Sequence, residues 1–183
     1  MRTFTLSFII FLSIGFTTNA QSINDSLPRR WKWERSVKTE LVLGYNWQAD
    51  WRDEQDSKTR GYIEVGVGRS IHSSGRHGSA VGGIYASEEI HFGSNNIYGT
   101  KLGAYTHFFL FDLGLAMVYY TDFKKGNFKL RPEMGFGMGP VRAVFGFNVP
   151  TIDNKAFEEL SRHRAQVTVQ VMVPLHKKIL KTN

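Results

Sequence analysis

The feature that most constrains this fold is an alternation of side-chain character with a period of two, clearest between residues 128 and 149. In FKLRPEMGFGM (128–138), apolar side chains occupy every second position, and charged residues or glycines stand between them. Because successive side chains of a β-strand point to opposite faces, this run predicts a strand with one apolar and one charged face. After Gly139-Pro140, the run VRAVFGFNV (141–149) continues the alternation. The two runs therefore predict a β-hairpin.

Similar runs recur along the chain and raise the expected number of strands to about eight. The further strands are expected at residues 38–48, 61–69, 80–87, 97–105, 109–121 and 164–173. A tilted strand of about ten residues is long enough to cross a bilayer, and an even number of strands closes with both ends on one side. The register between residues 80 and 109 stays open, since no glycine or proline marks the tight turn expected near 106–108.

The connections between these runs differ in length. Longer polar connections are expected at 50–60, 88–96, 122–127 and 150–161, and shorter ones at 106–108 and 137–141. Outer-membrane barrels have long loops outside and short turns in the periplasm, which this alternation matches. The exception is SIHSSGRHGS (70–79), which reads as a ten-residue loop where the topology requires a short turn.

The N-terminal residues have the order of a secretory signal peptide. Arg2 is the only charge in residues 1–20, an apolar run follows it, and small Ala20 precedes the expected cleavage point. We expect a polar leader at 21–36, one β-barrel domain at 37–175 and a basic C-terminal tail at 176–183. The absence of cysteine excludes a disulfide scaffold and an acylated cysteine. The net charge is +7 for the full chain and +6 without Arg2 of the expected signal peptide. In an exported chain this excess favours attraction to an anionic membrane surface, or simple solubility, over nucleic-acid binding.

The choice between a membrane barrel and a soluble one depends on which face looks inward. A lipocalin-like barrel has an apolar interior, whereas a small outer-membrane barrel has lipid around it and polar side chains within. Glycines share the charged face at seven positions: Gly44, Gly66, Gly68, Gly114, Gly135, Gly137 and Gly146. Small residues suit a narrow lumen that bulky apolar residues would overfill. We therefore expect an all-β protein, a single antiparallel up-and-down transmembrane β-barrel of about eight strands.

The C-terminal third of the chain also carries a family resemblance. The run YYTDF…GNFKLRPEMGFGMGPVRAVFGFNVP (119–150), with His163-Arg164 opening the last expected strand, is the part concerned. It resembles the Tyr-Tyr-Thr … Arg-Pro-Glu-hydrophobic-Gly-x-Gly … Gly-Tyr-Asn-hydrophobic-Pro pattern of small outer-membrane β-barrel proteins from Bacteroidota. Phe147 replaces the tyrosine of that pattern. The resemblance implies a porin-like barrel in the cell outer membrane and no particular activity.

Charged residues on the glycine-bearing face are the candidate site. Closed into a barrel, they are expected to meet in the lumen as a structural charge network: Glu64, Asp112, Arg131, Glu133 and Arg142. An isolated buried charge is prohibitively costly, so the charges are expected to pair. The functional alternative is a gate or a small-ion site.

The remaining motifs point to no chemistry. His72 and His77 share one expected loop without a metal-ligand spacing, and the Gly-x-Gly runs lack the strand-then-helix context of nucleotide loops. No Gly-x-Ser-x-Gly elbow occurs. We therefore expect no catalytic, cofactor or metal residue.

The function expected from the sequence is a structural or interaction role in the outer membrane, such as that of an accessory subunit of an envelope complex. The expected partners are outer-membrane lipid and lipopolysaccharide, or another envelope protein. Basic residues in the expected outer loops favour an anionic partner: Arg52, Lys58, Arg60, Lys124 and Lys125. The alternatives are a soluble periplasmic lipocalin-like ligand carrier and an outer-membrane barrel enzyme.

Overall fold

The structure is a computed structural model that describes residues 34–49, 60–75, 78–92, 96–151 and 165–180. These residues form one β-sheet. Its strands are β1 (Glu34–Ala49), β2 (Arg60–Gly75), β3 (Gly78–His91), β4 (Ile97–Phe108), β5 (Phe111–Thr121), β6 (Gly126–Met138), β7 (Val141–Phe147), β8 (Val149–Pro150) and β9 (Ala165–Leu180). In the part of the chain that is described, no helix is long and apolar enough to cross a membrane.

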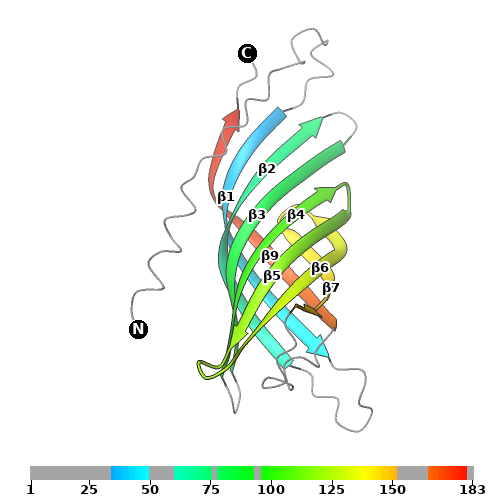
Figure 1. Cartoon of the computed structure of the whole chain (residues 1–183). Coiled ribbons are helices and arrows are strands. Elements are labelled where there is room, and N and C mark those ends of the chain that lie inside the picture. The colour runs from blue at the N-terminus through cyan, green and yellow to red at the C-terminus, as the bar shows by residue number, and fades with distance from the viewer. Residues whose placement is uncertain (1–33, 50–59, 76–77, 93–95, 152–164, 181–183) are drawn as a thin grey trace.

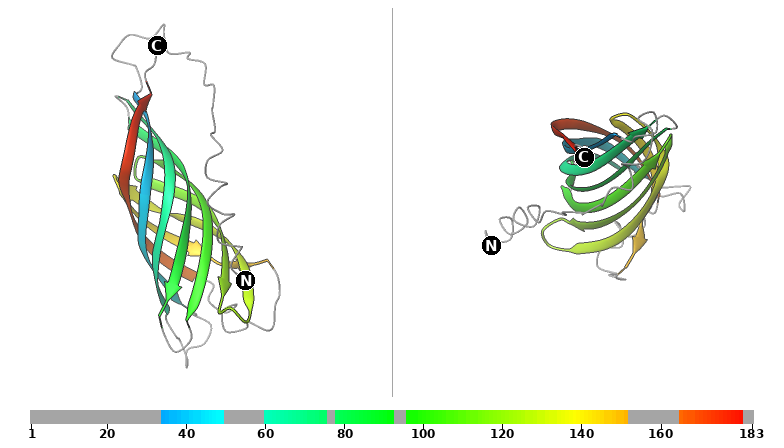
Figure 2. Two further views of the ribbon diagram at one scale, coloured as in Figure 1. Left: turned by 90° about the vertical axis from the view of Figure 1, so that its left-hand side faces the viewer. Right: turned by 90° about the horizontal axis from the view of Figure 1, so that it is seen from above.

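The sheet closes on itself. Its strand order is β5-β4-β3-β2-β1-β9-β7-β6-β8, and an additional pairing of β5 with β6 completes the ring (Figures 1 and 2). All pairings are antiparallel, and β8 is a two-residue continuation of β7 along β6. The sequence prediction of an all-β, eight-stranded antiparallel barrel is confirmed.

The break between β7 and β8 lies opposite a proline. β6 pairs with β7 as far as Glu133 and with β8 from Leu130, which leaves Arg131 and Pro132 without ladder partners on that side. Proline has no N–H to donate, so an interruption of the ladder is expected at this point. The Nε of Arg131 instead donates a hydrogen bond of 2.8 Å to Oδ1 of Asn148, the residue between β7 and β8.

The prediction of a ten-residue loop at 70–79 is wrong. β2 continues to Gly75, which pairs directly with Gly78 at the start of β3, so only residues 76 and 77 lie between the strands. The connection is therefore short, as the topology required. Ser70, His72, Ser73 and Ser74 therefore lie inside β2, near one end of the barrel.

The next short turn also differs from its expected place. It lies at Phe109-Leu110 rather than at 106–108, so Phe109 and Leu110 do not belong to the strand expected at 109–121. Phe109 takes a left-handed backbone conformation (φ 55°) that sequence reasoning assigns to glycine or asparagine. The N–H of Gly137 donates a 2.9 Å hydrogen bond to the carbonyl of Leu110, which ties this turn to the adjacent β6.

The strands reach further than the limits expected for the barrel. Arg35 pairs with Leu180, so residues 34–36 of the expected leader and 176–180 of the expected tail are strand. Residues 88–91, expected in a turn-rich connection, belong to β3. The expected signal peptide, the leader up to residue 33 and the last three residues of the tail lie outside the described residues, as do Arg52 and Lys58.

The pairing register is staggered around the ring. From Phe111 in β5, successive partners through β4, β3, β2 and β1 lead to Leu180 of β9, but through β6 and β7 they lead to Val169. Such stagger accompanies the tilt of the strands in a closed barrel. Here the stagger leaves part of β9 without a partner from β7. β7 begins at Val141, which pairs with Val171, and β9 continues past that pair to Leu180.

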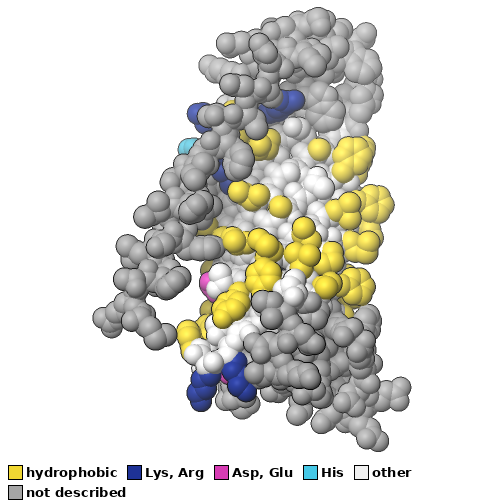
Figure 3. All heavy atoms as spheres, in the orientation of Figure 1, with side chains coloured by type: hydrophobic (Ala, Val, Ile, Leu, Met, Phe, Trp, Pro, Cys, Tyr) yellow, Lys and Arg dark blue, Asp and Glu magenta, His cyan; other side chains and the backbone are white. Residues whose placement is uncertain are grey.

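Side chains on the two faces of the wall differ as the sequence indicated. Phe111 and Leu113 are 67% and 56% exposed on the outside, whereas Glu133 and Arg142 are each only 3% exposed. Every strand of the ring contributes to an apolar belt of exposed side chains: Leu43, Val67, Ile84, Leu102, Leu115, Met134, Phe147 and Val169. Figure 3 shows hydrophobic side chains across the middle of one face and lysines or arginines toward its ends.

Glycines and tyrosines share the lumen as cross-strand pairs. Three tyrosines lie directly opposite a glycine of the neighbouring strand: Tyr105 opposite Gly83, Tyr85 opposite Gly103 and Tyr120 opposite Gly99. A Cβ added to any of these glycines would lie within 3.0 Å of the tyrosine ring. The glycines therefore provide the space in which the inward rings pack.

Candidate functional site

The candidate site is the charged interior of the barrel. Among the described residues, five acidic and four basic side chains are buried: Glu40, Glu64, Glu89, Asp112, Glu133, Lys101, Lys129, Arg131 and Arg142. They come from β1 to β7 and point into the ring, because they occupy the inward positions of the alternation. Charges this deeply buried require partners.

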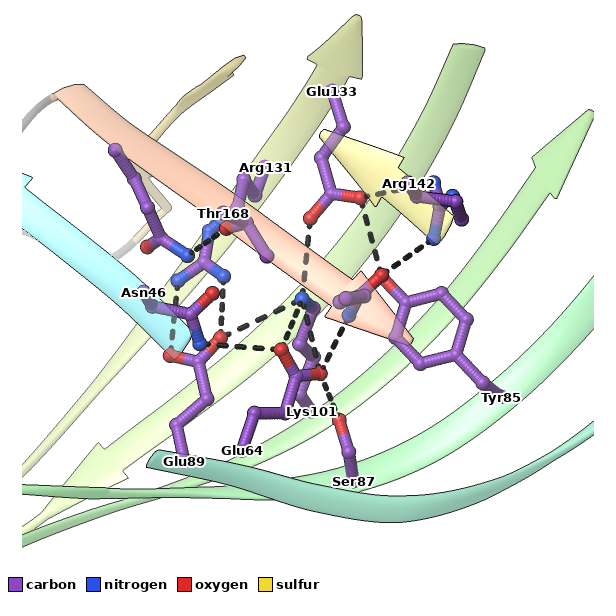
Figure 4. A network of polar contacts seen from close by, with 12 residues as sticks. Asn46, Glu64, Tyr85, Ser87, Glu89, Lys101, Arg131, Glu133, Arg142 and Thr168 are labelled. Atoms are coloured by element: carbon purple, nitrogen blue, oxygen red, sulfur yellow. Dashed lines mark hydrogen bonds and ion pairs between the residues drawn. The ribbon is translucent and has the colours of Figure 1, made fainter. Parts of the chain in front are cut away.

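Lys101 of β4 is at the centre of this interior (Figure 4). Its Nζ lies 3.3 Å from Oε1 of Glu64 in β2 and 3.3 Å from Oε1 of Glu133 in β6. The Oε1 of Glu89 in β3 is 3.5 Å away. One fully buried ammonium group thus joins three carboxylates from three strands.

Arg131 of β6 binds the same Glu89 from the other side. Its Nη1 lies 2.6 Å from Oε1 of Glu89 and its Nη2 lies 3.3 Å from Oε2, an arrangement in which the guanidinium holds both carboxylate oxygens. The hydroxyl of Tyr120 also donates to Glu89. Glu89 is therefore held by groups from β4, β5 and β6.

Arg142 of β7 makes the second two-point pair. Its Nε and Nη2 donate to Oδ2 and Oδ1 of Asp112 at 2.8 and 2.7 Å, and its Nη1 donates to Oε1 of Gln170 at 2.7 Å. The Nη2 also lies 3.6 Å from Oε2 of Glu133. The guanidinium stacks on the ring of Tyr105, with its Cζ 4.3 Å from the centroid.

The structure brings the five sequence-predicted residues into one network. Asp112, Arg142 and Glu133 are linked directly. Lys101 pairs with both Glu64 and Glu133, and Glu89 joins Arg131 to Lys101. Gln170 also bridges Glu64 and Arg142 by hydrogen bonds. We call these seven residues the lumen network: Glu64, Glu89, Lys101, Asp112, Arg131, Glu133 and Arg142.

Sequence reasoning missed Glu89 and Lys101, the two linking residues. Glu89 stood in a stretch assigned to a turn, and Lys101 stood in a strand whose facing was left open. The signal was present in Gly99-x-Lys101-x-Gly103, because a charge that alternates with glycines is the pattern of the inward face elsewhere in this chain.

Neutral side chains also bind one carboxylate of the network, that of Glu64. Glu64 accepts hydrogen bonds from Ser87 Oγ at 2.6 Å, from Gln170 Nε2 at 2.9 Å and from Asn46 Nδ2 at 3.2 Å. A carboxylate with this many donors has little acceptor capacity left for a metal ion. Within the described segments, no group of three or more His, Cys, Asp and Glu side chains is arranged to hold a metal.

A smaller polar cluster lies nearer the end of the barrel where β1 begins and β9 ends. Ser70 Oγ donates to Glu40 Oε2 at 2.8 Å and lies 2.9 Å from His72 Nε2. His72 Nε2 is also 3.6 Å from Glu40 Oε1. In a serine-histidine-acid relay, one imidazole nitrogen contacts the nucleophile and the other contacts the acid. Here both contacts involve Nε2, so this cluster does not form such a relay.

Basic residues expected in outer loops are described in part. Lys124 and Lys125 are exposed in the turn between β5 and β6. This turn lies at the end of the barrel where β1 ends and β9 begins. Their backbone N–H groups donate to Oδ1 of Asp122 at 2.9 and 2.7 Å. The bonds from Lys125 and Lys124 lower the pKa of Asp122 below its usual value. Both lysine side chains are thus presented on an ordered turn.

No protein-family model, curated protein or solved structure matches this chain.

Proposed function

We propose that this protein is an outer-membrane β-barrel with a structural or interaction role, exported by its N-terminal signal peptide. The observation that supports the proposal most strongly is the inversion of the two faces. The apolar belt faces outward on all eight strands of the ring, and the lumen network faces inward. Soluble monomers rarely expose a continuous apolar surface of this kind, whereas lipid requires one.

The closed sheet supports the same location. In hydrocarbon every backbone N–H and C=O must be bonded within the protein, and a ring of strands satisfies this requirement without an open edge in the spanning part. The aromatic side chains Trp47 and Tyr119, 44% and 48% exposed near strand ends, suit a membrane-water interface. The sequence resemblance to small outer-membrane barrels agrees with this proposal.

The lumen is filled by side chains, which favours a function carried by the two ends of the barrel over a function as a pore. Arg131, Lys101 and Tyr120 are each 0% exposed, and their charged or hydroxyl groups are bonded across the ring. An eight-stranded barrel has an interior just wide enough for side chains to fill. The partners we propose are outer-membrane lipid, with lipopolysaccharide phosphates near Lys124 and Lys125, and another envelope protein.

The two alternatives receive less support. A soluble lipocalin-like carrier needs an apolar interior for its ligand, and here the inward side chains are charged or polar at most positions. A barrel enzyme needs a positioned nucleophile and base. Ser70 and His72 are the pair that approaches this, and their contacts with Glu40 argue for a structural cluster.

A charge placed in the belt tests the proposal. Leu115→Arg puts a cation on the outside of β5, where Leu115 is 51% exposed. In a bilayer this costs about 2–4 kcal/mol at mid-depth, whereas at an exposed position in water the change is close to neutral. The measurement is the free energy of unfolding of the full chain folded into lipid vesicles.

The matched control is Phe123→Arg, because Phe123 is 75% exposed but lies in the turn between β5 and β6. We expect the control to behave as the unsubstituted protein. Release of the protein from cells by osmotic shock without detergent, together with unchanged folding of Leu115→Arg in water, would contradict the proposal.

A further inference from the structure

One rim of the barrel carries an open sheet edge. The register stagger carries β9 past the turn that joins β6 to β7, at the end where β1 begins, β9 ends and β2 is joined to β3 (Figure 1). We call this part the projecting ribbon: residues 34–40 of β1, 68–75 of β2 and 173–180 of β9. β9 is its outermost strand.

The outer side of β9 has no strand beside it in the described structure. The last β7 pair is Val141 with Val171, and the next contact is a 2.7 Å hydrogen bond from the N–H of Met172 to the carbonyl of Pro140. From residue 173 to residue 180, β9 pairs with β1 alone. Pro174 stands where the edge begins, a position that proline tolerates because no neighbour needs its N–H. Beyond it, about every second residue of the segment 175–180 therefore presents its N–H and C=O groups to a further strand.

The side chains of this edge are basic and apolar. The segment VPLHKKIL (173–180) contains two lysines and a histidine and no acidic residue. Leu175 and Ile179 are 61% and 64% exposed. Along a strand, Lys177 and Lys178 point to opposite faces, so an incoming strand meets a lysine whichever face its acidic residues occupy.

One pairing in the ribbon is unfavourable as it stands. Lys177 of β9 lies directly opposite Lys38 of β1. Like charges directly opposite each other destabilise a sheet. A carboxylate on a strand added beside β9 would lie next to Lys177 and offset this repulsion.

The same lysines argue against a second copy of the chain as the occupant. Antiparallel pairing of two β9 edges brings the lysines of one copy against those of the other, and edge lysines are a common device against such pairing. An anionic lipid headgroup supplies charge but cannot bond a row of alternating N–H and C=O groups. An extended peptide with acidic side chains supplies both.

We propose that the open edge of β9, residues 175–180, binds an acidic extended segment of an envelope protein, which adds to the sheet as a further strand. This inference rests on the proposed outer-membrane role and names the partner class for it. The backbone of β9 provides the bonds, Lys177 and Lys178 select the charge, and Leu175 and Ile179 gain apolar contacts.

The test uses the full chain folded in detergent micelles and a fluorescent octapeptide that alternates valine and glutamate. Fluorescence anisotropy is expected to show saturable binding, weakened at least tenfold by the double change Lys177→Glu and Lys178→Glu. That variant is expected to bind a valine-lysine octapeptide instead. The matched control, Lys124→Glu with Lys125→Glu at the opposite end, is expected to bind the glutamate peptide as the unsubstituted protein does.

A second peptide separates strand addition from charge alone. Methylation of alternate backbone nitrogens leaves the glutamates in place but removes N–H donors, and is expected to abolish binding. Equal binding of the methylated peptide, or equal loss in the Lys124 and Lys125 control, overturns the inference. Capture by phosphatidylglycerol vesicles without peptide binding overturns it in favour of the membrane surface.

The proposed function and this inference fail in different ways. A chain that forms no β-sheet by circular dichroism in detergent or lipid contradicts the membrane barrel. A chain that folds there and does not bind the peptide contradicts the docking edge alone.

Discussion

The lumen network and the projecting ribbon carry charge in opposite ways. In the network, Lys101 is fully buried and has three carboxylates within 3.5 Å. In the ribbon, Lys177 is exposed and lies opposite another lysine. The strands around the network are paired on both sides, whereas β9 in the ribbon is paired on one side.

This difference distinguishes charges that are paired inside the protein from the exposed charges to which we assign the proposed interaction. Charges that satisfy one another inside a closed ring are costly to break singly and have little left to offer a partner. Charges left unbalanced beside an open edge contribute little to stability and remain available.

Lys101→Met should have the largest effect. The change removes the ammonium group and leaves Glu64, Glu89 and Glu133 close together without it. Removing one partner of a buried ion pair costs about 3–5 kcal/mol. Urea unfolding of the protein in lipid vesicles measures the loss. Lys124→Met, in an exposed turn, is the control and should change stability by about 0.5 kcal/mol or less; a comparable loss in both variants would contradict the contrast.

Gly103→Val should have an intermediate effect. The inward position of Gly103 is covered by the ring of Tyr85, so a larger side chain displaces the ring and disturbs the network beside it. Overpacking of this kind costs about 1–3 kcal/mol. Gly82→Val is the matched control on the preceding strand, because an added Cβ at Gly82 meets nothing within 4 Å. Equal unfolding free energies for the two variants would show that the lumen is not tightly packed.

Lys177→Gln should change stability in the opposite direction. Removing one of two like charges that face each other across β9 and β1 should stabilise the sheet by about 0.2–1 kcal/mol. Lys178→Gln is the control, because Lys178 lies opposite Val37. The comparison is made by thermal or urea unfolding at low ionic strength. A loss of stability in Lys177→Gln would mean that this lysine already has a stabilising partner.

Asp122→Asn should have the smallest effect and a defined pH dependence. Hydrogen bonds from the backbone of Lys125 and Lys124 lower the pKa of Asp122 in the folded state. The stabilisation is therefore present above the pKa of the unfolded chain and is lost as the pH falls through the folded value. We expect the variant to be slightly less stable than the unsubstituted protein at neutral pH and equally stable in strong acid. A difference that persists in acid would contradict this origin.

Much of the barrel could be predicted from local alternation, because a period of two assigns each residue to a face without knowledge of its neighbours. Asp112, Glu133 and Arg142 were assigned to the lumen in this way. Alternation cannot give strand ends, which is why His72 was placed in a loop and Glu89 in a turn. Polar residues continue the strands past the belt there, and composition alone does not distinguish a polar strand end from a loop.

The pairing of the charges needed information that only the closed ring contains. Glu64 and Lys101 come from β2 and β4, which are not neighbours in the sheet, and they meet because the ring curves. The open edge of β9 likewise depends on the stagger, which accumulates around all the strands. No single segment of the sequence carries either feature.

The pairing of β1 with β9 has a consequence for how the molecule is made. It joins residues 35–49 to residues 165–180, so the paired residues lie 116 (Ala49 and Ala165) to 145 (Arg35 and Leu180) positions apart along the chain. Contacts between such distant segments form slowly, because closing the long loop between them costs conformational entropy before any of the contacts has formed. The ring therefore cannot be completed until synthesis has delivered the last strand. Until then the chain needs protection from aggregation.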